Sequence, residues 1–155
     1  MLSTSTTDWQ VRDEGRGHPV PTLGSRASGL RLRLHRGVVV TLRIVGPPRT
    51  KKNSMMMAHG RLMQSRQAME WQDKAVLQLQ SQTRGIIPCQ DPCNLTARIY
   101  RDKNHGDLGN YLAAICDALE KAGVVVNDKW IQGFDGSRLH VDRKNPRVEL
   151  ELTAL

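Results

Sequence analysis

The chain has 155 residues, of which 39% are hydrophobic, and its formal net charge is +8. That length allows one domain with its own core, and no apolar run approaches the roughly 20 residues of a membrane-spanning helix. The first residues, MLSTSTTDWQ, lack the basic-then-apolar order of a secretory signal, so we expect a cytoplasmic protein with no membrane partner.

The excess of positive charge favours a polyanionic partner, because neutralising phosphates releases the counterions that surround a nucleic acid. A solvated basic surface is the alternative, and charge alone does not decide between the two. The three cysteines, Cys89, Cys93 and Cys116, are an odd set with no Cys/His pair nearby at zinc spacing. We therefore expect reduced thiols rather than disulfides or structural zinc.

The first 36 residues differ in composition from the remainder. They are rich in Ser, Thr, Gly, Pro and Arg and show no sustained hydrophobic period, which predicts a basic, disordered tail over 1–36. Leu30, Leu32 and Leu34 alternate within this tail and would suit a short edge strand. The folded domain is predicted to span 37–155.

The domain begins with a predicted strand, hairpin and helix. The β-branched run 38–46 stops at two prolines, which is typical of a strand with an abrupt end. The turn-like AHG at 58–60 lies between short apolar runs and predicts a small hairpin. Ser65 is a candidate N-cap, and the apolar residues after it recur at helical spacing, which predicts a helix.

The second half of the domain alternates between strand and helix patterns. Leu95, Ala97 and Ile99 predict a half-buried strand, and the clearest helix of the chain follows it over 108–122. Asp107 is the cap candidate of this helix, and Gly123 lies where a left-handed C-terminal residue belongs. The apolar stripe of the helix comprises Leu108, Leu112, Ile115 and Leu119.

The last elements are predicted as two strands. The apolar run 124–126 breaks at Asn127–Asp128 and resumes as a strand, and residues 146–155 alternate Val148, Leu150 and Leu152. The complete order predicts a small mixed β-sheet with two main helices packed on it. Such a protein is a single domain of the α/β or α+β class.

Two acidic residues at element junctions form a candidate metal site. Taken alone, Asp107 is sufficiently explained as a helix cap and Asp128 as a turn residue. The extended run 123–126 returns along a good part of the four-turn helix, so the two carboxylates could approach each other. Mg²⁺ often takes only one or two protein carboxylates and keeps several waters. In a basic protein this pair favours metal-dependent phosphodiester cleavage.

Further candidates lie on the same helix and after the first strand. Asn110 suits a role in orienting a ligand or phosphate, whereas Asp117 is either a site residue or half of a surface pair with Lys121. In GPPRTKKNS (46–54) the prolines keep the backbone extended and hold the polar groups outward, which suits contact with a nucleic-acid backbone. A solvated basic loop is the alternative for this segment.

Three segments carry a resemblance to a known family. GPPRTKKNS, then RIYRDKNHGDLGNYLAAICDALEKAGVVVNDKWI (98–131), then PRVELELT (146–153) resemble the RusA-like Holliday junction resolvases, common in prophages. The resemblance covers roughly 38–153. It implies a small mixed α/β fold that works as a homodimer. It also implies paired nicking of four-way DNA junctions, in recombination and repair, that depends on Mg²⁺, with Mn²⁺ as a second suitable cation.

The resemblance also implies roles for individual residues. Asp107 and Asn110 match the first acid and the Asn of a D-x-D-N motif, and Asp128 matches the acid after the helix; Asp107 and Asp128 would hold the metal. Asp117 matches the acid of a DAL motif and joins the catalytic set. The residues expected to contact DNA are Arg49, Lys51, Lys52, Asn53 and Lys129.

Two positions depart from the family pattern. The second motif acid falls on Gly109, and a lysine tied to catalysis falls on Ala113. Gly109 offers no side chain, so one metal ligand is missing, although water can occupy a coordination position of Mg²⁺. The sequence therefore predicts an endodeoxyribonuclease of weakened activity. The alternatives are a dimeric module that binds branched DNA without cutting it, and a basic protein that does not bind DNA.

Overall fold

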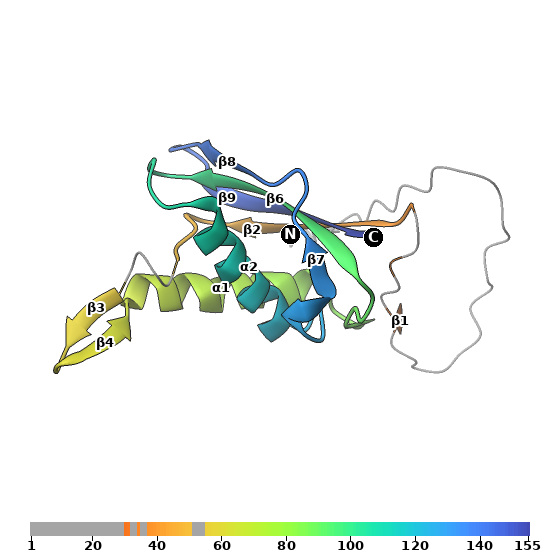
Figure 1. Ribbon diagram of the computed structural model, residues 1–155, viewed down its shortest axis with the longest axis horizontal. Coiled ribbons are helices and arrows are strands. Elements are labelled where there is room, and N and C mark those ends of the chain that lie inside the picture. The colour runs from red at the N-terminus through yellow and green to blue at the C-terminus, as the bar shows by residue number, and fades with distance from the viewer. Residues whose placement is uncertain (1–29, 32–33, 35–36, 51–54) are drawn as a thin grey trace, which may run out of the picture.

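Three long strands with every second residue buried form most of a mixed sheet (Figure 1). They are β2 (Val39–Val45), β6 (Cys93–Arg101) and β9 (Arg147–Ala154). The computed structural model describes residues 30–31, 34, 37–50 and 55–155. Within these residues the sheet has five strands, in the order β2-β9-β6-β7, with β8 also paired to β6.

Strand direction determines which loops meet. β9 is antiparallel to both β2 and β6, whereas β7 (Ile131–Gly133) and β8 (Arg138–Val141) are parallel to β6. β7 pairs with the beginning of β6 and β8 with its end. Consequently β2, β6 and β8 end at the same edge of the sheet, where β9 begins. We call this side the carboxyl edge.

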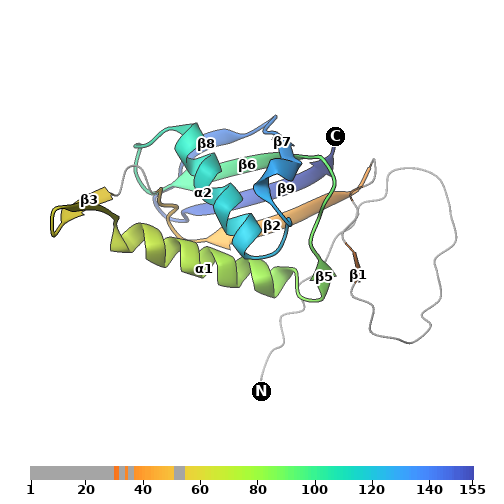
Figure 2. The ribbon, with the colours of Figure 1, turned by 60° about the horizontal axis from the view of Figure 1, so that its bottom comes forward.

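Both helices cover one face of the sheet (Figure 2). α1 (Arg66–Gln82) begins at Ser65, whose side chain accepts a hydrogen bond from the Ala68 N–H, as expected for the predicted N-cap. α2 (Leu108–Lys121) begins at Asp107 and is followed by Gly123 with φ of +74°. A left-handed residue at that position favours glycine because it has no Cβ.

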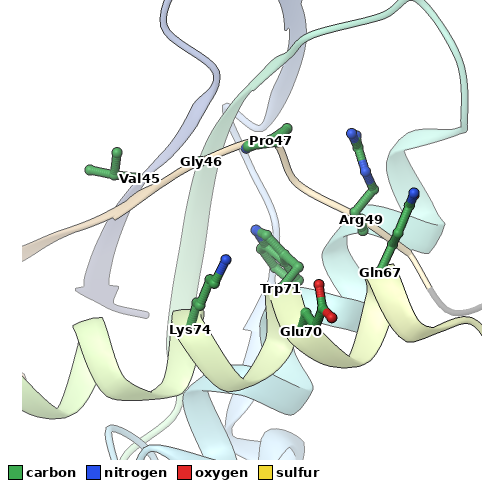
Figure 3. Close-up of a pocket in the computed structure, with 8 residues that line it drawn as sticks. All are labelled: Val45, Gly46, Pro47, Arg49, Gln67, Glu70, Trp71 and Lys74. Carbon is green, nitrogen blue, oxygen red and sulfur yellow. The ribbon is translucent and has the colours of Figure 1, made fainter.

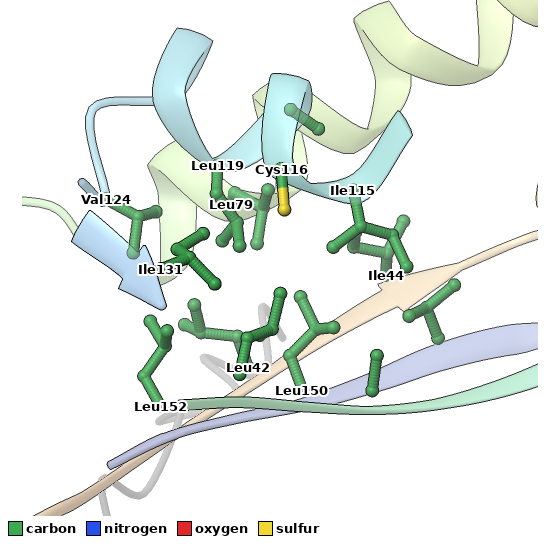
Figure 4. Packing of buried hydrophobic residues seen from close by; sticks show 14 of the residues in the cluster. Leu42, Ile44, Leu79, Ile115, Cys116, Leu119, Val124, Ile131, Leu150 and Leu152 are labelled. Carbon is green, nitrogen blue, oxygen red and sulfur yellow. The ribbon is translucent and has the colours of Figure 1, made fainter. Parts of the chain in front are cut away.

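The core lies between the helices and the sheet (Figure 4). Leu42 and Ile44 of β2 and Leu150 and Leu152 of β9 point toward the helices, where Ile115 and Leu119 of α2 and Leu79 of α1 meet them. The predicted inward residues of β6 and β9 are all fully buried: Leu95, Ala97, Ile99, Val148, Leu150 and Leu152. The predicted fold class, a mixed sheet with two helices in one domain, is confirmed.

The outer edge of β2 is covered by two glutamines of α1. Gln82 accepts from the Arg43 N–H at 2.9 Å and donates to the Arg43 carbonyl at 2.7 Å. Gln78 does the same at Val45, with distances of 2.8 and 3.1 Å. Each side-chain amide thus replaces a neighbouring strand, so this part of the edge cannot pair with another chain.

The predicted hairpin is present as β3 (Met55–Ala58) and β4 (Arg61–Gln64). Its two-residue turn has positive φ at His59 and Gly60, the combination that matches the twist of a tight hairpin. These strands form a two-stranded sheet of their own and project from the body in Figure 1.

Other local features differ from the sequence prediction. β8 was not predicted, and the run 124–126 forms only an isolated bridge, between Val125 and Cys89, instead of a strand. The break after it is a short 3-10 helix, η2 (Asp128–Trp130), before β7. Val124 and Val125 turn inward to the core after Gly123, which explains their apolar character without a strand.

The described residues also include part of the segment assigned to the tail. β1 (Leu30–Arg31) pairs in parallel with β5 (Ile86–Ile87), and Leu34 is buried in the core. Residues 1–29 lie outside the described residues, so the tail stays a prediction there. No helix in the part of the chain described here has the length and apolar character needed to cross a membrane.

Candidate metal and nucleic-acid site

The six residues between β6 and α2 are organised by Arg101. This side chain is 6% exposed. Its Nη1 donates to the carbonyls of His105 (2.8 Å) and Gly106 (3.2 Å), and its Nη2 donates to Asn104 Oδ1 (3.0 Å). The planar fork of a guanidinium suits several acceptors at once. Arg101 therefore fixes the segment that leads directly into Asp107.

Asp107 is the N-cap of α2 at the carboxyl edge, as predicted. Its Oδ1 accepts from the Asn110 backbone N–H at 2.9 Å, and its Oδ2 accepts from Asn110 Nδ2 at 2.6 Å. The carboxylate is exposed, and each oxygen has a further lone pair beyond these bonds. Asp107 thus offers hard oxygen donors of the kind that Mg²⁺ and Mn²⁺ take.

Tyr111 and Arg49 also contact the segment between β6 and α2. The Tyr111 hydroxyl donates to the His105 carbonyl at 3.2 Å, and burial raises the pKa of this phenol. Arg49 forms two hydrogen bonds of 2.9 Å to the carboxylate of Asp102. These bonds are the main reason that the pKa of Asp102 falls to about 2. Arg49 is therefore fixed at the carboxyl edge, and its contact with DNA stays a prediction.

Asp128 is the first residue of η2, which packs against α2. Its backbone N–H donates to Glu120 Oε2 at 3.0 Å, which places Asp128 beside the last turns of the helix. The pKa of the Cys116 thiol rises to about 12, first because of burial and then because of the charges of Asp128 and Asp117. Both carboxylates therefore lie close enough to Cys116 to affect its ionisation.

The predicted site residues thus form two groups along α2. Asp107 and Asn110 are bonded to each other at its first turn, whereas Asp117 and Asp128 share the surroundings of Cys116. Cys116 lies nine positions after Asp107 along α2, a rise of about 14 Å. Among the described residues, no hydrogen bond or ion pair joins Asp107 to Asp128, and no cluster of three or more Asp, Glu, His or Cys forms a metal cage. A shared cation stays a prediction.

The predicted DNA-contacting residues are only partly described. Lys129 is exposed beside Asp128, and its Nζ lies 5.4 Å from the ring centroid of Trp130. Lys51, Lys52 and Asn53 lie outside the described residues. A basic segment not predicted from the sequence occurs at 142–146, between β8 and β9, where Arg143 and Lys144 are exposed at the carboxyl edge. The sequence feature that could have revealed it is DRKNP, a polar segment ending in proline, which is typical of a turn between two strands.

A hollow of about 340 Å³ lies between the end of β2 and α1 (Figure 3). Trp71 rises from α1 toward Gly46 and Pro47, and its buried indole N–H has no hydrogen-bond acceptor among the described residues. Arg49 and Lys74 line the hollow together with Glu70, so its charge is mixed. That mixture does not select one class of ligand.

Comparison with known proteins adds one finding. A family model described as Endodeoxyribonuclease RusA matches residues 45–153, which is more than half of the chain. A search of curated proteins gave no significant match. The matched region contains the end of β2, both helices, η2 and the whole carboxyl edge of the sheet.

Proposed function

The chain belongs to the RusA endodeoxyribonuclease family, and from that premise we propose that it cleaves four-way DNA junctions in recombination and repair. The family match is the main support for this proposal. The matched region lies within the folded domain and includes all four predicted catalytic residues, Asp107, Asn110, Asp117 and Asp128. The net charge of +8 supports a nucleic-acid substrate, since basic residues gain binding free energy by releasing counterions from phosphates.

In this proposal a divalent cation, Mg²⁺ or Mn²⁺, is held by Asp107 and Asp128. The two carboxylates lie in separate groups along α2 in this structure, so the proposal requires that they approach each other when the cation binds. The exposed carboxylate of Asp107, fixed by Asn110 and with lone pairs remaining, supports its assignment as a ligand. A bound divalent cation supplies positive charge to the scissile phosphate and lowers the pKa of a water ligand. Asn110 keeps the Asp107 carboxylate in one orientation, and Asp117 adds negative charge near Asp128.

Positive side chains would hold the DNA around this site. Lys129 lies directly after Asp128 and is exposed, which suits contact with a phosphate close to the cation. Lys51, Lys52 and Asn53 follow Arg49 closely in the sequence, and Arg49 itself is fixed by Asp102. These residues orient the backbone and carry no sequence preference by themselves.

We propose that the enzyme is of the prophage type and that it is a homodimer, because paired cuts in two strands need two sites. The glutamine pairs at Arg43 and Val45 occupy that part of the β2 edge. The proposed dimer therefore uses a surface other than this edge.

A second candidate function is binding of branched DNA without cleavage. The observation that favours it is Gly109, one residue before Asn110, where the family motif carries a second acid. A Cβ built at Gly109 would lie 3.6 Å from Asp107 Oδ1, so the missing carboxylate would have stood directly beside the proposed cation ligand. Without it, less negative charge is available to hold the metal.

A synthetic four-way junction, labelled on one strand at a time, tests both functions. The full chain is incubated with the junction and with a linear duplex of the same sequence, in Mg²⁺, in Mn²⁺ and in EDTA. We expect preferential binding to the junction and symmetric nicks that need a divalent cation. Junction binding without product at any cation concentration would support the second candidate. Equal affinity for junction and duplex at moderate salt would exclude both functions.

A further inference from the structure

The turn 142–146 is built around the carboxylate of Asp142. Its Oδ1 accepts from the backbone N–H groups of Lys144 (3.2 Å) and Asn145 (3.1 Å), and its Oδ2 accepts from Arg147 Nη1 (3.0 Å). These bonds hold the pKa of Asp142 below its ordinary value, with the Asn145 N–H as the largest cause. The side chain of Asp142, the first residue of the turn, therefore stabilises the turn by hydrogen bonds to its later residues and to Arg147.

Arg147, which follows the turn, is held by three groups besides Asp142. Its guanidinium lies 3.7 Å from the ring centroid of Tyr100, its Nε donates to Glu149 at 2.7 Å, and its Nη1 also donates to the Asn145 carbonyl at 3.0 Å. Stacking of a guanidinium on an aromatic face restricts its movement. Both ends of the turn are therefore anchored to the sheet.

The turn also touches the loop that leads to Asp107 and the loop that contains Arg49. The Asp142 N–H donates to the Arg101 carbonyl at 2.8 Å, and Arg101 fixes the segment leading to Asp107. At the other end, the Gly46 N–H donates to the Pro146 carbonyl at 3.0 Å, immediately before the loop that contains Arg49. The turn thus lies between the two loops at the carboxyl edge.

Arg143 and Lys144 form the exposed tip of this turn. Both side chains are exposed, and neither makes an ion pair within the part of the chain that the structure describes. Asp142 and Glu149, the nearest acids on the same elements, are both bonded to Arg147 instead. Two cations on a closed turn lose less conformational entropy on binding an anion than cations on a free loop.

We propose that the turn 142–146 is a DNA-backbone clamp, in which Arg143 and Lys144 bind phosphates of the strand that enters the site between the two loops. The clamp rests on the proposed function, because the polyanion is taken to be the DNA substrate of the same site. It adds a contact formed by the β8–β9 connection, separate from residues 49–53 and from Lys129.

A paired charge experiment tests the clamp. The double variant Arg143→Gln/Lys144→Gln is compared with Arg43→Gln/Arg84→Gln, which removes two exposed positive charges on β2 and just after α1, at positions with no proposed DNA contact. Binding of the full chain to the labelled junction and to linear duplex is measured by fluorescence anisotropy over a series of salt concentrations. Thermal unfolding establishes that each variant is folded.

For the first variant we expect affinity to fall roughly tenfold or more at low salt, on both DNA substrates. The slope of log K against log salt should decrease by about 2, since each lost phosphate contact removes about 0.9. The control variant should keep the wild-type slope. Equal slopes for the two variants would overturn the clamp even if the wild type prefers and cuts junctions. If the wild type shows no junction preference, the proposed function fails, while the slope difference on duplex still decides the clamp. A wild type that binds no DNA would overturn both.

Discussion

Both carboxylate oxygens of Asp107 accept hydrogen bonds from one residue, Asn110. Oδ1 accepts from the backbone N–H at 2.9 Å and Oδ2 from the side-chain amide at 2.6 Å. One bond is that of a helix cap, and the other fixes the orientation of the carboxylate. Asp107 thus serves α2 and, in our proposal, the cation, and substitutions can separate these roles.

Asp107→Asn should preserve the cap and remove the charge. Asn and Asp are comparable N-caps, so we expect the free energy of unfolding to change by only a few tenths of a kcal/mol, and DNA cleavage to be lost. Asp107→Ala should lose cleavage and also about 1 kcal/mol of stability. Urea unfolding and the junction assay, applied to both variants, measure the two effects. Full cleavage by a folded Asp107→Asn protein would remove this residue from the proposed site.

Gly109→Asp should increase cleavage. The new Cβ would lie at ordinary contact distance, 3.6 Å from Asp107 Oδ1, and an acid in the first helical turn is favoured by the helix dipole. A second carboxylate at this position should strengthen cation binding. We expect at least a tenfold rise in the single-turnover rate and a lower Mg²⁺ requirement, equivalent to about 1.4 kcal/mol or more of barrier.

Gly109→Asn is the matched control, because it adds a side chain of the same shape without the charge. It should leave the rate close to that of the wild type. If Gly109→Asp also leaves the rate unchanged while the protein is folded, the family motif does not describe the chemistry at this position.

Arg101→Met should destabilise the protein and its site together. The substitution removes the Arg101 donors to the carbonyls of His105, which keeps the Tyr111 hydroxyl, and of Gly106, at a cost of about 2 kcal/mol. Cleavage should fall through a higher Mg²⁺ requirement, because the segment before Asp107 is no longer fixed. Arg101→Lys should recover part of both effects.

Arg138→Met is the control for that substitution. Arg138 is exposed on β8, and its Nη1 donates to the adjacent Ser137 carbonyl at 2.8 Å. We expect its stability and Mg²⁺ requirement to remain near wild type. An Arg101→Met protein that behaves in the same way would show that Arg101 does not position the site.

The ion pair of Asp102 with Arg49 should make stability depend on pH in acid. The folded-state pKa of Asp102, about 2, lies below the ordinary 3.8, so its contribution is complete above pH 5 and is lost as the pH falls toward 2. Asp102→Asn should therefore cost about 2 kcal/mol at pH 7, and roughly half of this at pH 3. Urea unfolding at both pH values measures the difference.

Asp135→Asn provides the comparison for the pH experiment, because Asp135 is exposed and forms no ion pair within the described residues. Its effect on stability should be small and similar at both pH values. A constant cost of Asp102→Asn between pH 7 and pH 3 would mean that the bond to Arg49 does not hold the charged form.

The spacing of hydrophobic residues was sufficient to predict the strands and helices that bury one face. β6 and β9 alternate because each second residue faces the helices, and α2 shows the 3.6-residue period for the same reason. β8 has no such pattern, since only Leu139 of its four residues is even partly buried. Its place in the sheet depends on pairing with β6, about 40 residues earlier, which local sequence does not encode.

Site residues with local roles were predictable, whereas those with long-range partners were not. Asp107 was recognised because caps follow from sequence position, and the structure confirms the cap. The role of Arg101 depends on the backbone carbonyls of His105 and Gly106. Every residue has such a carbonyl, so the sequence does not show which ones Arg101 binds. The pairing of Arg49 with Asp102 joins residues 53 positions apart, so the sequence predicted only an outward-facing cation that contacts DNA.

We propose that Asp107 and Asp128 together support metal-dependent cutting of four-way junctions. The most direct measurement is the cleavage of a labelled junction by wild type and by Asp128→Asn, with junction affinity recorded in parallel. We predict divalent-cation-dependent nicks by the wild type, and none by Asp128→Asn at unchanged affinity. Undiminished cleavage by Asp128→Asn, or no cleavage by the wild type in either Mg²⁺ or Mn²⁺, would contradict the claim.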